Sequence, residues 1–292
     1  MIFGHERQIQ YLEKVLKKGR LAHAYLFYGP EHVGKFTVAK YLAGLLNFPE
    51  TIILSPEETL VSRKERRKDI PIDDIRELKR RLSFAPAGGA WRAAIINEAQ
   101  NLSQEAADAF LKVLEEPGPN TVILLIASSP EFLPPTVVSR AQPLRFSLVS
   151  DNLMAKFLSG KVQNEKERKE LLVLSSGRPG ILKKLLEDPD YLKNSRRVLK
   201  NVLTILETGD LGAAFYFAQT ISGDAEAREQ AIEYLMRAFR YKLMRAGEGN
   251  LTDILYRIKK INRAAKILET TNVNPRLAMD VIFLSAAAPS SC

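Results

Sequence analysis

The chain has 292 residues, of which 46% are hydrophobic and 26% charged, an ordinary composition for a folded globular protein. Its length predicts about two or three domains rather than one small core. No apolar run approaches the roughly 20 residues of a membrane span, so we expect no membrane association. The only cysteine, Cys292, ends the sequence, which excludes an internal disulfide or a cysteine-based zinc site, and we expect a reducing cytoplasm.

The net charge of +9 favours a polyanionic partner, but only weakly. Basic residues are densest at 63–68, and Arg76, Lys79, Arg80 and Arg81 follow. No aromatic side chains are interleaved with these charges to stack on bases. A solvated helix face explains the cluster at least as well as a nucleic-acid patch, and both interpretations stay open.

In the first half of the chain, short apolar runs alternate with helical patterns. Strands are predicted at residues 24–28, 51–54, 92–97, 121–127 and 144–146. Helices are predicted around residues 9–16, 38–45, 72–82 and 103–116, the last with Ser103 as its N-cap. The strand runs are continuously apolar, which predicts a parallel sheet covered by helices on both faces. Trp91, beside the third run, is interpreted as a core residue.

From about Ser150 the strand-like runs end and helical periodicity continues. Long helices are predicted at residues 191–207, 211–221, 225–245, 251–269 and 275–286. The predicted fold class is therefore α/β plus all-α, in three domains. These are a parallel-sheet domain at 1–149, a small helical domain at 150–188 and an all-helical domain at 189–292.

A glycine loop with the sequence GPEHVGKF follows the first predicted strand, at residues 29–36. Gly29, Gly34 and Lys35 can offer backbone N–H groups and an ammonium to a phosphate at a helix N-terminus. The pattern requires Ser or Thr after the lysine, because that hydroxyl is a ligand of the magnesium ion that accompanies ATP. Phe36 occupies this position and has no oxygen to offer.

A second departure concerns the same ion. The strand at 92–97 should end in an acidic pair that holds the metal, but Asn97 precedes Glu98, and a neutral amide is a weaker ligand for a hard cation. Two separate segments have each lost a group that would touch the same ion. We predict a nucleotidase architecture that holds no metal, requires no cofactor and serves a purpose other than hydrolysis. Weak metal-free binding of ATP, ADP or phosphate stays open.

Further stretches, read together with this loop, resemble bacterial clamp-loader subunits of the AAA+ family. They are residues 23–27, 97–100, 106–117 with the sequence LEEP, and 133–140, which resembles the LPxTxxSRC pattern of such subunits. The LEEP helix and the Ser–Arg pair are specific together, whereas either alone is weak. Residues 271–277 are similar to the last helices of the delta-prime subunit of DNA polymerase III, so the resemblance covers the whole chain.

The resemblance implies an AAA+ P-loop (RecA-like) domain, a helical lid domain and a helical collar domain within the boundaries given above. It implies that Arg140 is an arginine finger for ATP held by a neighbouring subunit, because a guanidinium forks onto phosphate oxygens. Arg178 matches the sensor 2 arginine, and Ser128 or Ser129 the sensor 1 residue. Ala141 replaces the cysteine that usually follows the finger.

The implied function is that of a non-hydrolysing stator in a ring that loads a sliding clamp onto primed DNA. The gamma/tau motor and delta subunits would be its neighbours. Subunits of this kind often carry a four-cysteine zinc module after the phosphate-loop helix, and residues 46–74 contain no cysteine. This favours delta-prime over gamma/tau.

Two other functions were weighed. In an active ATPase motor, Thr37 would replace the missing hydroxyl and Glu98 would hold the metal through water. One residue along a helix rotates a side chain by about 100°, however, which turns Thr37 away from the ion. In a helicase loader or replication initiator, the basic residues at 63–68 would grip DNA, although the C-terminal half shows no evident helix-turn-helix pattern.

Overall fold

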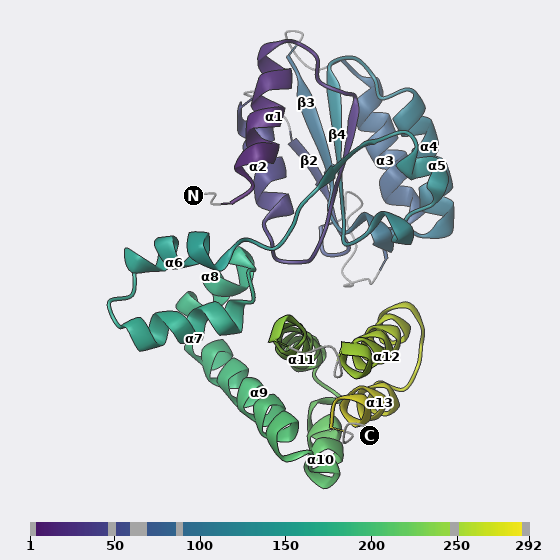
Figure 1. Ribbon diagram of the computed structural model, residues 1–292. Helices are drawn as coiled ribbons and strands as arrows, with labels where there is room; N and C mark the ends of the chain where they lie inside the picture. The colour runs from purple at the N-terminus through teal and green to yellow at the C-terminus, as the bar shows by residue number, and fades with distance from the viewer. Residues whose placement is uncertain (1–3, 46–50, 59–68, 86–89, 246–250, 288–292) are drawn as a thin grey trace. The chain divides into compact units, whose positions relative to one another are not determined.

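The computed structural model describes residues 4–45, 51–58, 69–85, 90–245 and 251–287 (Figure 1). The basic segment at 63–68 therefore lies outside the described residues. The chain forms two compact units: Met1–Lys161 with Gly177–Gly180, and Val162–Ser176 with Ile181–Cys292. The segment predicted as a lid domain, 150–188, is divided between them, and the three-domain division stays a prediction.

The first unit is built on a five-stranded sheet with the order β2-β3-β4-β1-β5, in which every pair is parallel. The strands are β1 Ala24–Tyr28, β2 Thr51–Leu54, β3 Arg92–Ile96, β4 Thr121–Ala127 and β5 Gln142–Arg145. Nearly every residue of β1, β3 and β4 is buried. The parallel sheet predicted from continuously apolar runs is confirmed.

Helices cover both faces of this sheet (Figure 1). They are α1 Glu6–Lys17 and α2 Lys35–Leu45 on one face, and α3 Ile72–Ser83, α4 Gln104–Glu115 and α5 Pro135–Val138 on the other. Alternate residues of β1 supply two separate cores: Phe27 packs in a cluster with Val38, and Leu26 in a cluster with Phe110. Each buried side chain of this size contributes about 1.5–3 kcal/mol to folding.

A buried arginine joins helix α3 to the sheet. The Arg92 guanidinium donates to the carbonyl oxygens of Arg81, Leu82 and Phe84, and its Nε donates to Thr121 Oγ1 at 3.1 Å. The carbonyls at the end of α3 lack helical partners, and Arg92 satisfies them. Trp91 is 41% exposed, so its interpretation as a core residue was wrong. Successive strand residues point to opposite faces of the sheet, and the Arg92 side chain lies on the face that α3 covers.

The second unit is helical throughout its described residues. After α6 Asp151–Ser159, which belongs to the first unit, come α7 Glu165–Ser175, α8 Pro179–Glu187, α9 Pro189–Thr208, α10 Leu211–Ile221, α11 Ala225–Arg245, α12 Leu251–Thr270 and α13 Pro275–Ala287. Arg196 of α9 forms an ion pair with Glu170 of α7 at 2.7 Å, and Arg237 of α11 donates to the carbonyl oxygen of Leu172. Helix α7 is thus bonded to the C-terminal helices. None of the described helices has the length and apolarity needed to cross a membrane.

A substitution at Gly29, the first residue of the glycine loop, tests how closely this loop packs against the backbone of Phe146. Its φ of +140° is in a region that L side chains rarely adopt, and a Cβ there would overlap the backbone carbonyl oxygen of Phe146. We expect Gly29→Ala to lower the free energy of unfolding by more than about 2 kcal/mol in urea denaturation. Gly44→Ala, in helix α2 with open space around it, should raise it by up to about 1 kcal/mol. Equal stabilities for the two variants would contradict this.

Candidate nucleotide site and arginine finger

The phosphate loop, residues 29–35, joins the carboxyl end of β1 to helix α2. The N–H of Gly29 donates to the carbonyl oxygen of Ser128, directly after β4, at 3.2 Å. Left-handed backbone occurs at His32, with φ 57°, and at Gly34, with φ 108°. The strand, loop and helix predicted from the sequence are therefore all present, in the context that phosphate binding requires.

Lys35 is 7% exposed and points back at its own loop. Its Nζ donates to the carbonyl oxygens of Gly29 at 2.5 Å and Pro30 at 2.6 Å. Burial is the main reason that the pKa of Lys35 is lowered to about 8; Arg178 lowers it further, and Glu31 opposes the shift. An entering phosphate would have to draw this ammonium away from two carbonyl oxygens.

The residue at the metal-ligand position serves the core instead. Phe36 packs against the cluster that contains Val38 and Phe27, and Lys40 Nζ lies 4.2 Å from the centroid of its ring. Thr37, one position later, is exposed on α2. The aromatic ring therefore has a packing role of its own at the start of the helix.

The acidic-pair position after β3 is occupied by amides and one carboxylate. Asn97 Nδ2 lies 3.5 Å from Glu98 Oε1, and Asn101 Nδ2 donates to Glu98 Oε2 at 3.1 Å. Burial raises the pKa of Glu98, and the carboxylates of Glu31 and Glu57 add to the rise. Both asparagine amides are placed to donate to the Glu98 carboxylate, so Glu98 is a hydrogen-bond acceptor at the end of the strand.

The two serines after β4 differ in what they do. Ser129 Oγ accepts from the N–H of Glu131 at 3.4 Å and so caps the short helix Pro130–Phe132. This is the turn-forming role that strand-end serines often have. Ser128 contributes its carbonyl oxygen to Gly29, as described above, and is thereby the nearer of the two to the phosphate loop.

A strap, residues 177–180, passes against the phosphate loop within the first unit. The N–H of Gly180 donates to the carbonyl oxygen of His32 at 2.8 Å, and the N–H of Val149 donates to that of Gly177 at 2.8 Å. A Cβ at Gly180 would come within 3.0 Å of the His32 oxygen, so a glycine suits this approach. Arg178 of the strap is buried and close enough to Lys35 to lower its pKa.

His5 belongs to no motif in the sequence, yet its side chain contacts the phosphate loop. Its Nε2 lies 2.9 Å from the carbonyl oxygen of Val33 in the phosphate loop, and its ring meets that of Phe146 edge-on, with the centroids 4.8 Å apart. Burial lowers the pKa of His5, so the ring favours its neutral form. No motif would have found this contact, because 28 residues separate the two partners.

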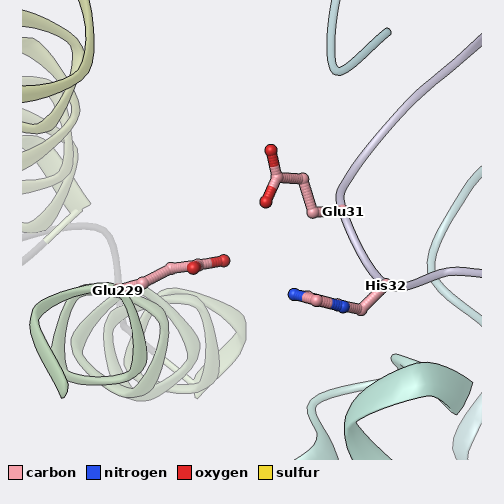
Figure 2. Close-up of side chains that lie close together, drawn as sticks. All are labelled: Glu31, His32 and Glu229. Atoms are coloured by element: carbon pink, nitrogen blue, oxygen red, sulfur yellow. The ribbon is translucent and has the colours of Figure 1, made fainter. Parts of the chain in front are cut away.

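Figure 2 draws the side chains of Glu31 and His32 on the phosphate loop, together with Glu229 of helix α11. Glu229 belongs to the second unit, and the positions of the two units relative to one another are not determined. We therefore assign no metal site to these three side chains.

Arg140 lies at the other end of the sheet. It lies two residues before the amino end of β5, whereas the phosphate loop follows the carboxyl end of the neighbouring parallel strand β1. Gln142, the first residue of β5, is paired with Tyr25, four residues before Gly29, so at about 3.3 Å per residue the strands alone separate the two by some 13 Å. The side chain is 37% exposed, its guanidinium is paired with Glu115 at 2.7 Å, and Nη1 donates to the carbonyl oxygen of Thr136. Arg140 is thus placed away from its own chain's phosphate loop.

These features define the class of protein. A parallel sheet with a phosphate loop after β1, an Asn97–Glu98 pair after β3 and a helical segment that follows the sheet matches the architecture of AAA+ proteins. A solved point variant of RuvB from Thermotoga maritima has the same fold, with a TM-score of 0.51 at 14% identity over 94% of this chain and 87% of that one. The AAA+ fold with additional helices is therefore confirmed.

The family follows from the sequence comparison. The family model described as DNA polymerase III, delta subunit, matches residues 4–150, about half of the chain, and the chain belongs to this family. It is 27% identical over 225 residues to DNA polymerase III subunit tau of Bacillus subtilis, covering 71% of this chain and 40% of that one. It is 34% identical over 160 residues to subunit tau of Escherichia coli, covering 50% and 25%. The chain thus spans less than half the length of these relatives.

The lowered pKa of Lys35 gives a test of the phosphate loop. We expect Nζ to titrate near pH 8, in NMR spectra of isotope-labelled lysine assigned with a Lys35→Met variant. Pyrophosphate without magnesium should raise this pKa if the loop binds anions, because a nearby negative charge favours the ammonium. A pKa near 10.5 in the free protein would contradict the burial of this side chain.

The same group predicts a pH dependence of stability. The folded chain releases this proton near pH 8 and the unfolded chain near 10.5. Between these values the unfolded state binds more protons, so the contribution of Lys35 to the free energy of unfolding rises with pH. Lys35→Met should lack this rise in denaturation curves recorded between pH 8 and 10.5. If Lys35→Met leaves the slope of the unfolding free energy against pH unchanged, the lowered pKa of Lys35 is contradicted.

Proposed function

We propose that the chain is a clamp-loader subunit of the delta-prime type that acts in DNA replication. In this role it is a non-hydrolysing stator, and it supplies Arg140 to ATP held by a neighbouring subunit. Its partners would be the gamma/tau motor and delta subunits, the sliding clamp, and primed DNA in the assembled complex. Membership of a DNA polymerase III family and the similarity to tau subunits support this setting.

The observation that carries the proposal is the packing of Phe36. Magnesium beside a triphosphate needs a hydroxyl at this position, and the side chain present is an apolar ring that is partly buried and packs against the core. Asn97 offers an amide where the second ligand should be an aspartate. Without these two oxygens the site would not hold the magnesium ion that neutralises the negative charge on the phosphate oxygens during phosphoryl transfer.

The surroundings of the phosphate loop support a fixed conformation. The loop's own carbonyls hold the ammonium of Lys35, and the strap is bonded directly to His32. These contacts need no nucleotide. A ligand shifts a conformational equilibrium only as far as it binds one state more tightly than the other, and a loop whose polar groups are already paired within the chain leaves a nucleotide less to gain. This suits a stator.

The position of Arg140 supports action on another subunit. An arginine at the end of the sheet opposite to its own phosphate loop cannot assist that loop without a large rearrangement. An exposed guanidinium at a surface can instead reach phosphate oxygens of a nucleotide bound next door.

The alternative is an active AAA+ motor subunit of a clamp loader. The similarity to tau subunits and the presence of Lys35 and Glu98 favour it. In that case Thr37 must supply the missing oxygen. The exposure of Thr37 on α2 speaks against this assignment.

Calorimetry separates these two functions. We expect magnesium to leave the affinity of the wild-type chain for ATP unchanged, because the two metal ligands are missing. In the double variant Phe36→Thr, Asn97→Asp, magnesium should tighten ATP binding by about tenfold or more, equivalent to about 1.4 kcal/mol. Circular dichroism controls for folding of the variant. Magnesium-dependent ATP turnover by the isolated wild-type chain would favour the motor.

The finger is tested in the reconstituted clamp loader. Arg140→Ala should lower DNA-stimulated ATP turnover by about tenfold or more, since an arginine finger stabilises charge in the transition state. The melting temperature of the chain should stay nearly constant, because an exposed ion pair contributes at most about 1 kcal/mol. Arg145→Ala, an exposed arginine on β5, is the matched control. Unchanged turnover in the Arg140 variant would refute the finger.

A further inference from the structure

One oxygen of the Glu115 carboxylate binds both Nε and Nη2 of the Arg140 guanidinium. Glu115 Oε1 accepts from Nε at 3.0 Å and lies 2.7 Å from Nη2. Nη1 donates to the carbonyl oxygen of Thr136, at the start of α5, at 3.0 Å. The contacts come from the last turn of α4 and from α5, and both helices are packed in the core of the first unit.

This arrangement leaves part of the guanidinium available. A guanidinium carries five N–H donors, and the three contacts occupy one each on Nε, Nη1 and Nη2. The remaining donors are on Nη1 and Nη2, the two terminal nitrogens that form the forked end of the group. With 37% of the side chain exposed, this end can take phosphate oxygens in a bidentate manner.

The contribution of the Arg140–Glu115 ion pair to folding stability is a poor explanation of its presence. Both partners are substantially exposed, at 37% and 50%, and ion pairs of this kind contribute little to folding. A fixed orientation, in contrast, matters to an arginine that acts across a boundary. A long side chain with several rotatable bonds loses entropy when it is placed on a phosphate, and a side chain that is already held loses less.

We propose that Glu115 is the positioning residue of the arginine finger. It holds the Nε edge of Arg140 so that the forked end faces the γ-phosphate of ATP on the neighbouring subunit. This inference rests on the proposed function, because it requires that Arg140 acts on that phosphate. Glu116, the next residue, is also exposed and is in no ion pair recorded among the described residues, so it provides a matched control.

The test is a double-mutant cycle in the reconstituted clamp loader, with DNA-stimulated ATP turnover measured at saturating ATP. We expect Glu115→Ala to lower kcat by about three- to tenfold, with Glu116→Ala unchanged. Glu115→Gln keeps an acceptor oxygen and should retain part of the lost activity. In the Arg140→Ala background, Glu115→Ala should have no further effect, because its only role is to hold the absent group.

Three results would overturn the inference, and they are distinguishable. Normal turnover in Glu115→Ala, with Arg140→Ala impaired, would leave the finger standing and remove the positioning role. A loss that persists in the Arg140→Ala background would show that Glu115 acts through other groups. Normal turnover in Arg140→Ala would remove the finger itself. Melting temperatures and complex assembly, measured for each variant, exclude loss of folding as the cause.

Discussion

The common direction of the strands is the constraint on which the functional geometry depends. Because all pairs in the sheet are parallel, every loop that follows a strand lies at the carboxyl ends of the strands, here called the first edge. Every loop that leads into a strand lies at their amino ends, the second edge. The phosphate loop after β1 and the amide at Asn97 after β3 share the first edge. Arg140, before β5, and Glu115, before β4, share the second. The fold therefore keeps the phosphate loop and the Arg140–Glu115 pair at opposite ends of the strands.

At the first edge, the chain satisfies its own polar groups. Two carbonyl oxygens of the loop accept from Lys35, and a third, at His32, accepts from the strap. Backbone groups that would otherwise await a ligand or water are thereby paired internally. The lysine stays buried with a lowered pKa, which is a free-energy cost that the core must offset. Such a cost is typical of residues placed for a site rather than for stability.

Local patterns predicted most of the architecture and only part of the site. The apolar runs located four strands closely and the fifth with a start two residues too late, since β5 begins with the exposed Gln142. The glycine loop, Phe36 and Asn97 could be read directly, because each depends on neighbours in sequence. The bonds of the strap to His32 and of His5 to Val33 could not, since they join residues far apart in the chain. The burial of Trp91 was predicted wrongly for a related reason. Arg92, its neighbour, is the buried residue because it binds carbonyl oxygens at the end of α3, which are not its neighbours in the sequence.

The two edges also differ in what their residues contribute to folding. Phe36 is a partly buried apolar ring that packs against the core at the position where the phosphate-loop pattern has a metal ligand, so at this position folding and metal binding favour different residues. At the second edge, Arg140 and Glu115 form an exposed pair from which the fold gains little. The proposed action of Arg140 on a neighbouring subunit's nucleotide therefore rests on two features: an exposed ion pair that the fold does not need, and an apolar ring where the phosphate-loop pattern has a metal ligand.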